Sequence, residues 1–223
     1  MMNIKKIIGR QNAKKATGYV VVIDILRAAT VEAYALSKGT KYIIPVSSTK
    51  EAFDLKKRNP SYILVGEKDG YKIKGFDYGN SPSEIIEANL ENKILIHRSS
   101  SGTKGLFNAV NAKKLIFGSF VTASAIVKYL QLKNPDSVSL LALGKDDIIC
   151  ANYLELLLEG NNPDVGMLRK AVYEEPSASC FLDETKPEFP IMDLELALDF
   201  NRFDFICFAE RVSDGLRTIR QDI

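Results

Sequence analysis

The feature that most constrains the fold of this chain is a series of short, apolar, β-branched runs that recur along it. The runs expected to be strands cover residues 19–25, 41–46, 62–67, 93–98, 114–119, 137–143 and 203–209. Runs with almost no polar interruption are typical of strands covered on both faces of a sheet. The pattern therefore predicts a sheet buried between two layers.

Segments with helical character separate these runs. Amphipathic spacing or capping residues predict helices over residues 29–38, 49–58, 82–90, 103–111, 120–132 and 146–159. Strands that alternate with helices favour βαβ units. We therefore predict an α/β fold with three layers, α/β/α, around a mostly parallel sheet.

No linker long or polar enough to divide the chain interrupts this pattern. We predict a single domain over residues 1–223. Residues 159–190 are the least regular part, with the segments NNPD, EEPS and KPEFP. We expect them to form a helical excursion or a lid.

Charge and apolar run length exclude several classes of partner. The 30 Lys and Arg nearly balance the 28 Asp and Glu, so we expect no nucleic-acid partner and no anionic membrane surface. No apolar run approaches the roughly 20 residues of a membrane helix, and no signal peptide is visible. The three cysteines lie in apolar surroundings, as reduced core thiols do. We expect a cytoplasmic protein, and a homodimer as its default assembly.

The residues at the ends of the apolar runs carry the chemistry, because ligands of open α/β sheets bind at the carboxyl ends of the strands. Asp24 follows the first run directly, with Arg27 shortly after it. An ionised carboxylate there is costly unless a cation offsets it. Asp24 could bind magnesium or accept a phosphoryl group, or it could simply cap the next helix.

The loop HRSSSGT follows the fourth run. Free backbone N–H groups and hydroxyls between a strand and a helix can hold a phosphate, although the same loop could merely cap the helix. It lacks the Walker A spacing, which argues against a nucleoside triphosphatase. Arg98 could bind an anion or form a salt bridge, and His97, the only histidine, is expected to be a buried supporting residue.

Further acids and hydroxyls stand at other run ends: Glu67 lies in GEKDG, and Ser119 ends the fifth run. Asp77 and Asn80 lie in GFDYGNSPSE, which could supply a carboxylate and hydrogen bonds to a ligand or could be merely a turn and a helix cap. Asp146 and Asp147 begin a predicted helix, where they could bind a metal, act as an acid, or only stabilise the helix dipole.

Taken in order, these motifs resemble a known family. VVIDILRAAT, GEKDG, GFDYGNSPSE, SSSGTKG, FGSF, the paired aspartates and LDFNRFDF resemble the 2-phosphosulfolactate phosphatases of coenzyme M biosynthesis, from about Tyr19 to Ala209. The resemblance implies a three-layer α/β/α fold and magnesium-dependent hydrolysis of a small anionic phosphomonoester, 2-phosphosulfolactate. The site candidates that it implies are Asp24, Arg27, Glu67, Asp77, Asn80, Ser101, Gly102, Thr103, Ser119 and Asp147.

We assign roles to the candidates as follows. The expected catalytic residues are Asp24, Asp147 and Arg27. The expected Mg²⁺ ligands are Asp24, Glu67, Asp77 and Asp147. The expected substrate-binding residues are Asn80, Arg98, Ser100, Ser101, Gly102, Thr103 and Ser119.

The chain departs from the family pattern at several positions. A single Thr30 stands where the family has a run of threonines, and Ser100 and Ser101 stand where it has Thr and Asn. These changes leave two alternatives open: a phosphatase for another small phosphorylated hydroxy acid or sugar acid, and a non-catalytic paralogue that binds anions.

Two mechanisms fit this set of residues. Asp24 could form an aspartyl phosphate, or water could attack phosphorus directly with a carboxylate as base. Haloacid dehalogenase phosphatases use the first route with a D-x-D pair, but Leu26 stands two residues after Asp24. Direct attack by water is therefore favoured.

Overall fold

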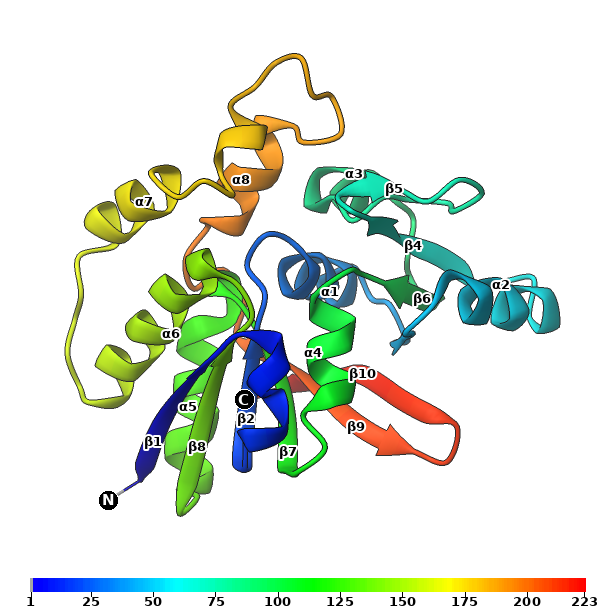
Figure 1. Cartoon of the computed structure of the whole chain (residues 1–223). Coiled ribbons are helices and arrows are strands. Elements are labelled where there is room, and N and C mark those ends of the chain that lie inside the picture. The colour runs from blue at the N-terminus through cyan, green and yellow to red at the C-terminus, as the bar shows by residue number, and fades with distance from the viewer. Residues whose placement is uncertain (1) are drawn as a thin grey trace.

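A computed structural model describes residues 2–223 of the chain and shows one mixed sheet flanked by helices (Figure 1). The strands are β1 Asn3–Ile8, β2 Gly18–Ile23, β3 Tyr42–Pro45, β4 Ile63–Lys68, β5 Tyr71–Lys72, β6 Ile94–Arg98, β7 Ala112–Gly118, β8 Ser137–Ala142, β9 Phe205–Val212 and β10 Gly215–Asp222. The helices are α1 Ala28–Ser37, α2 Thr49–Arg58, α3 Pro82–Glu87, α4 Gly102–Asn108, α5 Ala123–Lys133, α6 Lys145–Leu158, α7 Val165–Tyr173 and α8 Ile191–Ala197.

The sheet contains two parallel blocks. Its strand order is β1-β8-β2-β7-β9-β10-β3-β6-β4-β5. Strands β1, β8, β2 and β7 are mutually parallel, and so are β3, β6 and β4. The antiparallel hairpin of β9 and β10 lies between the blocks and meets β3 at a single pair, Thr218 with Ile43.

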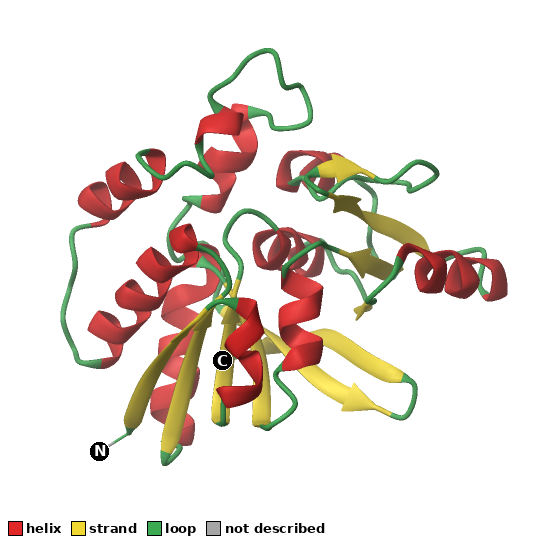
Figure 2. Ribbon diagram, viewed as in Figure 1, coloured by secondary structure: helices red, strands yellow, loops and turns green. Residues whose placement is uncertain are grey.

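Alternation along β2 explains the layers. Val20 and Val22 belong to a core on one face of the sheet, shared with α1 and α4, whereas Val21 and Ile23 belong to a core on the other face, shared with α5 and α6. All four side chains are fully buried. A strand buried on both faces has the nearly continuous apolar sequence seen here. The two helical layers can be followed in Figure 2.

These observations confirm the predicted three-layer α/β/α fold with a mostly parallel sheet. The prediction missed β1, β5 and β10, which contain few consecutive apolar residues. Residues 159–190 contain α7 and a short 3-10 helix at Ser179–Phe181, joined by irregular chain. Within the described residues, no helix combines the length and apolar character that crossing a membrane requires.

Candidate active site

A cavity of about 280 Å³ lies where strand ends from both parallel blocks meet. Asp24 follows β2, Glu67 lies in β4, and Ser99, Ser100 and Ser101 follow β6. The other lining residues are Leu26, Arg27, Asp69, Gly70, Asn80, Ser177, Cys180, Phe181 and Phe189. The structure thus brings together residues far apart in sequence, at the strand ends where ligands of α/β proteins bind.

A larger cavity of about 550 Å³ lies between α2 and the β9–β10 hairpin. Its carboxylates include Asp54, which pairs with Lys50 at the exposed surface of α2. No residue of the predicted site lines this cavity. The smaller cavity is therefore the candidate active site.

Asp24 is buried at the floor of the site. Its Oδ1 accepts the Ala28 N–H at 3.0 Å, at the start of α1, and the residue is only 5% exposed. The pKa of Asp24 is raised from 3.8 to about 7, mainly by burial and to a smaller extent by the charges of Asp146 and Glu67, while the Ala28 hydrogen bond opposes the rise. The carboxyl group can therefore gain or lose a proton near neutral pH.

Gly102 allows α4 to begin directly against Asp24. A Cβ atom at this position would lie 2.6 Å from Asp24 Oδ2 and 2.7 Å from the Ala28 Cβ atom. Real Cβ atoms essentially never approach other atoms so closely. Gly102, which was predicted to bind substrate, therefore has a steric reason to be glycine. Its lack of a Cβ atom lets the backbone of residues 99–101, here called the serine loop, approach the Asp24 carboxylate.

Glu67 organises the serine loop. Its carboxylate accepts the Ser100 backbone N–H, the Ser100 hydroxyl at 3.0 Å and the Gly70 N–H at 2.7 Å. Glu67 is 5% exposed. Hydrogen bonds to the Glu67 carboxylate therefore hold the loop after β6 and the β4–β5 turn in place.

Arg98 and Thr103 brace the same loop from behind. Arg98 donates to the Glu67 carbonyl and to Ser100 Oγ at 3.1 Å, and the Thr103 hydroxyl donates to the Ser99 carbonyl at 3.0 Å. Both side chains are buried, and neither lines the cavity. These contacts support the loop, although Arg98 Nε has no hydrogen-bond partner within the described residues. The expected contact of Arg98 and Thr103 with substrate stays a prediction.

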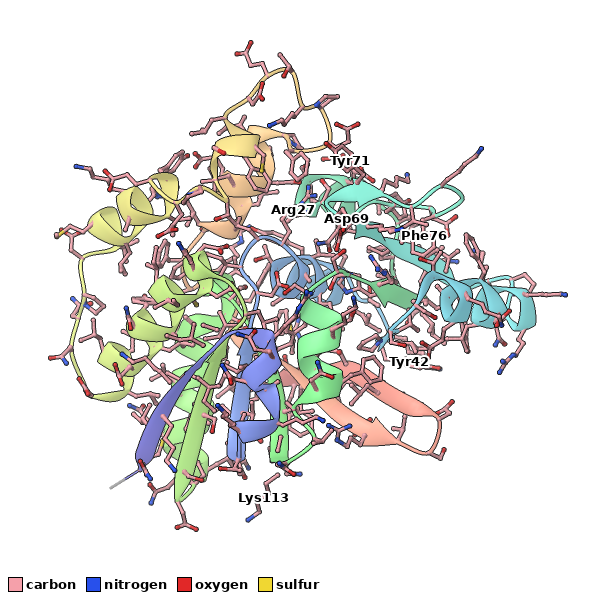
Figure 3. All side chains as sticks on the ribbon, in the orientation of Figure 1. Arg27, Tyr42, Asp69, Tyr71, Phe76 and Lys113 are labelled. Atoms are coloured by element: carbon pink, nitrogen blue, oxygen red, sulfur yellow. The ribbon has the colours of Figure 1, made fainter. Side chains whose placement is uncertain are left out.

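Arg27 lines the cavity, but its guanidinium group is held by the protein. It forms an ion pair with Asp193 at 2.6 Å and donates to the carbonyls of Glu188 and Gly70, each at 3.0 Å. It also lies 5.4 and 4.9 Å from the ring centroids of Phe181 and Phe189. Figure 3 shows Arg27 beside Asp69 and Tyr71, next to β5. Arg27 therefore joins the segment before α8 to the β2–α1 loop.

Sequence analysis missed Asp193, which is fully buried in the first turn of α8. Besides Arg27, its carboxylate accepts the hydroxyls of Ser81 and Ser83 at 2.8 and 2.7 Å. In the sequence, Asp193 is only an acid shortly after Pro190, which also fits an ordinary helix cap. The cavity-lining residues Ser177, Cys180, Phe181 and Phe189 were missed as well, because they lie in the segment without regular spacing.

Asp147 caps α6 in the structure. Its two oxygens accept the Ile25 and Gly144 N–H groups, each at 2.8 Å, and it does not line the cavity. Burial and the charges of Asp146 and Asp24 raise its pKa well above the ordinary value. Asp147 thus caps the helix outside the cavity, and its expected catalytic and metal-binding roles stay predictions.

Two other candidates lie away from the cavity. Asp77 is half-exposed and accepts the Leu64 N–H at 2.7 Å, with Lys56 at 3.4 Å. Ser119 is fully buried, and its hydroxyl has no hydrogen-bond partner within the described residues. Neither lines the cavity, and the expected roles of Asp77 as a metal ligand and of Ser119 as a substrate contact stay predictions.

The donor set at the cavity fits a hard cation. Within residues 2–223, neither Asp24 nor Glu67 forms a salt bridge with Lys, Arg or His. No three His, Cys, Asp or Glu side chains in that range are arranged to hold a metal by themselves. Magnesium is commonly bound by one or two carboxylates, with water and phosphate oxygens as its other ligands. Two buried, unpaired carboxylates beside a phosphate-sized cavity suit that pattern.

Comparison with known proteins identifies the relatives of the chain. The family model described as 2-phosphosulpholactate phosphatase matches residues 6–201. Proteins named probable 2-phosphosulfolactate phosphatase from Thermoplasma acidophilum and Carboxydothermus hydrogenoformans are 41% and 47% identical over 65% and 62% of this chain. Those segments span 67% and 60% of the two relatives.

A third relative matches over nearly its whole length. The protein of the same name from Clostridium tetani is 33% identical over 95% of both chains. Together with the family match over residues 6–201, this shows that the chain belongs to the 2-phosphosulfolactate phosphatase family, a family of phosphoric monoester hydrolases.

Proposed function

We propose that this protein is a magnesium-dependent phosphatase that hydrolyses 2-phosphosulfolactate to sulfolactate and phosphate. The observation that carries the proposal is the meeting in one cavity of two buried carboxylates without a salt bridge, Asp24 and Glu67, with Ser101, whose N–H and hydroxyl donate to no other group of the described residues. The printed names of the relatives support the choice of substrate.

Asp24 and Glu67 are the residues that would hold Mg²⁺. When bound, the ion would offset their charge and that of the phosphoryl oxygens, which is the main electrostatic demand of phosphoryl transfer. The two carboxylates come from different parallel blocks of the sheet. Their separation is therefore set by the sheet, and it is not left to a flexible loop.

The serine loop would position the phosphoryl group. Ser101 precedes α4, and Gly102 lets this backbone approach Asp24. Backbone N–H groups and hydroxyls of the loop are neutral donors for an anionic group. Arg27 lines the cavity as a fixed side chain. Its positive charge is largely neutralised by the ion pair with Asp193.

Attack by water is the favoured route. Water forms a bond to phosphorus as the bond from phosphorus to the sulfolactate oxygen breaks. A carboxylate of the cavity accepts one proton of the water and passes it to the departing oxygen, so that the carboxylate ends as it began. Leu26 lines the cavity two residues after Asp24, where an aspartyl-phosphate mechanism of the D-x-D type would need an acid. A hydroxylamine-labile phosphoenzyme in rapid-quench samples would overturn this route.

Phosphate release tests the proposed function. Purified protein would be given racemic 2-phospho-3-sulfolactate or 2-phospholactate, each with Mg²⁺ and with EDTA. We expect release with Mg²⁺, and faster release from the sulfonate. Faster release from another phosphorylated hydroxy acid or sugar acid would identify that compound as the better substrate, while the reaction would remain phosphomonoester hydrolysis. No release from a broad phosphomonoester panel by folded protein would contradict the proposal and favour an anion-binding paralogue.

A further inference from the structure

A buried row of polar side chains runs from α1 to the cavity. Glu32 Oε1 lies 2.8 Å from His97 Nδ1, and His97 Nε2 lies 3.0 Å from Asn80 Oδ1. Glu32 and His97 are 0% and 1% exposed, and Asn80 is 5% exposed and lines the cavity. Two of these three residues never reach the cavity, so their polar groups act on a ligand only through Asn80.

The chemistry of the acceptor fixes the proton on His97. The Asn80 oxygen can only accept a hydrogen bond, so His97 Nε2 must carry a hydrogen and donate it. Nδ1 then either donates to ionised Glu32 or accepts a hydrogen from protonated Glu32. In both cases Nε2–H holds the Asn80 carbonyl.

The hydrogen bond from His97 to the Asn80 side-chain carbonyl determines which end of the Asn80 amide faces a ligand. Asn80 Nδ2 has no hydrogen-bond partner within the described residues, and this atom is not fully buried. It therefore faces the space that Asn80 lines. A rotated amide would instead present its oxygen, which repels the oxygens of a phosphate, sulfonate or carboxylate group.

We infer that Glu32 and His97 are positioning residues that orient Asn80 so that its Nδ2–H₂ group donates to an anionic group of the substrate. This inference deepens the proposed function and rests on it for the identity of the anion. It gives a role to a buried histidine that the hydrolysis itself does not use.

The tautomer can be observed directly, because His97 is the only histidine of the chain. A two-bond ¹H–¹⁵N correlation spectrum of the full chain therefore contains one imidazole pattern. We expect Nε2 to be protonated, with and without added inorganic phosphate. A neutral ring with hydrogen on Nδ1 and a bare Nε2 would overturn the inference, because Asn80 would then turn its oxygen to the cavity.

A matched pair of variants tests the consequence for binding. His97→Gln places an amide N–H₂ near the position of Nε2 and can still hold Asn80, whereas His97→Asn reaches only toward Glu32. We expect His97→Asn to raise KM, and the dissociation constant of inorganic phosphate, about tenfold or more, since a hydrogen bond to a charged group is lost. His97→Gln should stay within about threefold of the unchanged protein, because it retains that bond. For both variants we expect a similar kcat.

The two readouts separate this inference from the proposed function. Equal phosphate binding by His97→Asn and His97→Gln, with both variants folded, would overturn the inference even if the unchanged protein hydrolyses 2-phosphosulfolactate. Weaker phosphate binding by His97→Asn alone would support it even if that substrate is not turned over. A purely structural role for His97 would lower the melting temperature of the variants without separating their phosphate affinities.

Discussion

The buried carboxyl group of Asp24 makes the stability of the metal-free protein depend on pH. Its pKa is about 7 in the folded chain and 3.8 without burial, so the folded state binds the proton more tightly. The contribution of Asp24 to stability is therefore fully present below the lower value and is lost as pH rises through 7. A shift of this size corresponds to at most about 4 kcal/mol at pH 8.

Replacing Asp24 with Asn tests this dependence. We expect Asp24→Asn to be more stable than the unchanged protein at pH 8 without metal, by up to about 4 kcal/mol, and to lose phosphatase activity. Urea unfolding from pH 5 to pH 8 in EDTA would measure the difference. A stability difference that does not change with pH, or full magnesium-dependent activity in the variant, would contradict the role of Asp24.

Gly102 offers a second test at a single residue. In Gly102→Ala the new Cβ atom would have to displace Asp24, Ala28 or the Phe117 ring. We expect a loss of about 1–3 kcal/mol from overpacking and a sharp fall in kcat. Gly166→Ala in α7 is the control, because its Cβ meets only the Asp164 side chain, at 3.1 Å. Unchanged melting temperature and activity in Gly102→Ala would refute the steric argument.

The sequence located the cavity residues better than it assigned their roles. Asp24, Glu67, Ser100 and Ser101 line the cavity because each stands near a strand end, which a sequence pattern reveals, whereas Asn80 lies just before α3. Whether a buried polar side chain contacts a ligand or braces the backbone depends on where its hydrogen bonds go. Those partners, such as Asp193 for Arg27, come from remote segments.

At the scale of elements, the ion pair of Arg27 and Asp193 fastens α8 and the chain before it to the β2–α1 loop. The two side chains are 4% and 0% exposed. In Asp193→Asn, Arg27 would remain buried without its counter-charge, so we expect a loss of about 3–5 kcal/mol. Hydrogen exchange should also speed up in residues 177–190, which share the contact.

A second ion pair on the same helix provides the control. Glu195 pairs with Arg169 at 2.9 Å, but the two side chains are 45% and 39% exposed. Glu195→Gln should change stability by less than about 1 kcal/mol. If Asp193→Asn were as mild as this control in urea unfolding and hydrogen exchange, the fastening role would be excluded.

The strands that were predicted from apolar runs share one property, burial on both faces of the sheet. Strand β2 shows it fully, because its alternate residues enter two different cores. Two of the missed strands carry charged residues between apolar ones. These are β1 at the sheet edge, with the sequence NIKKII, and β10, with the sequence GLRTIRQD. Such strands resemble surface loops in an apolar-run search, so the hairpin that joins the blocks was predicted as a single final strand.

At the scale of the whole molecule, bound magnesium should stabilise the fold, because an ion that binds only the folded state shifts unfolding by mass action. At one hundred times its dissociation constant, Mg²⁺ should add about 2.7 kcal/mol. Thermal unfolding with increasing Mg²⁺ would measure this. Asp24→Asn should show little response, and an equal rise in both proteins would argue against a site at Asp24.

The overall architecture was predictable because alternation of buried strands and helices admits few arrangements. The three-layer fold was confirmed, whereas the splitting of the sheet into two parallel blocks was not foreseen. That splitting depends on strand order, which requires pairings between remote residues such as Thr218 and Ile43. The homodimer and the lid over residues 159–190 remain predictions.

The position of the β9–β10 hairpin also has a consequence for protein synthesis. The hairpin occupies the middle of the sheet, yet it is translated after every other described strand. While the chain grows on the ribosome, β7 and β3 must keep open edges that only this hairpin can pair. Open edges attract other strands. The edges of β7 and β3 are therefore exposed to pairing with other chains until the last residues of the hairpin have left the ribosome.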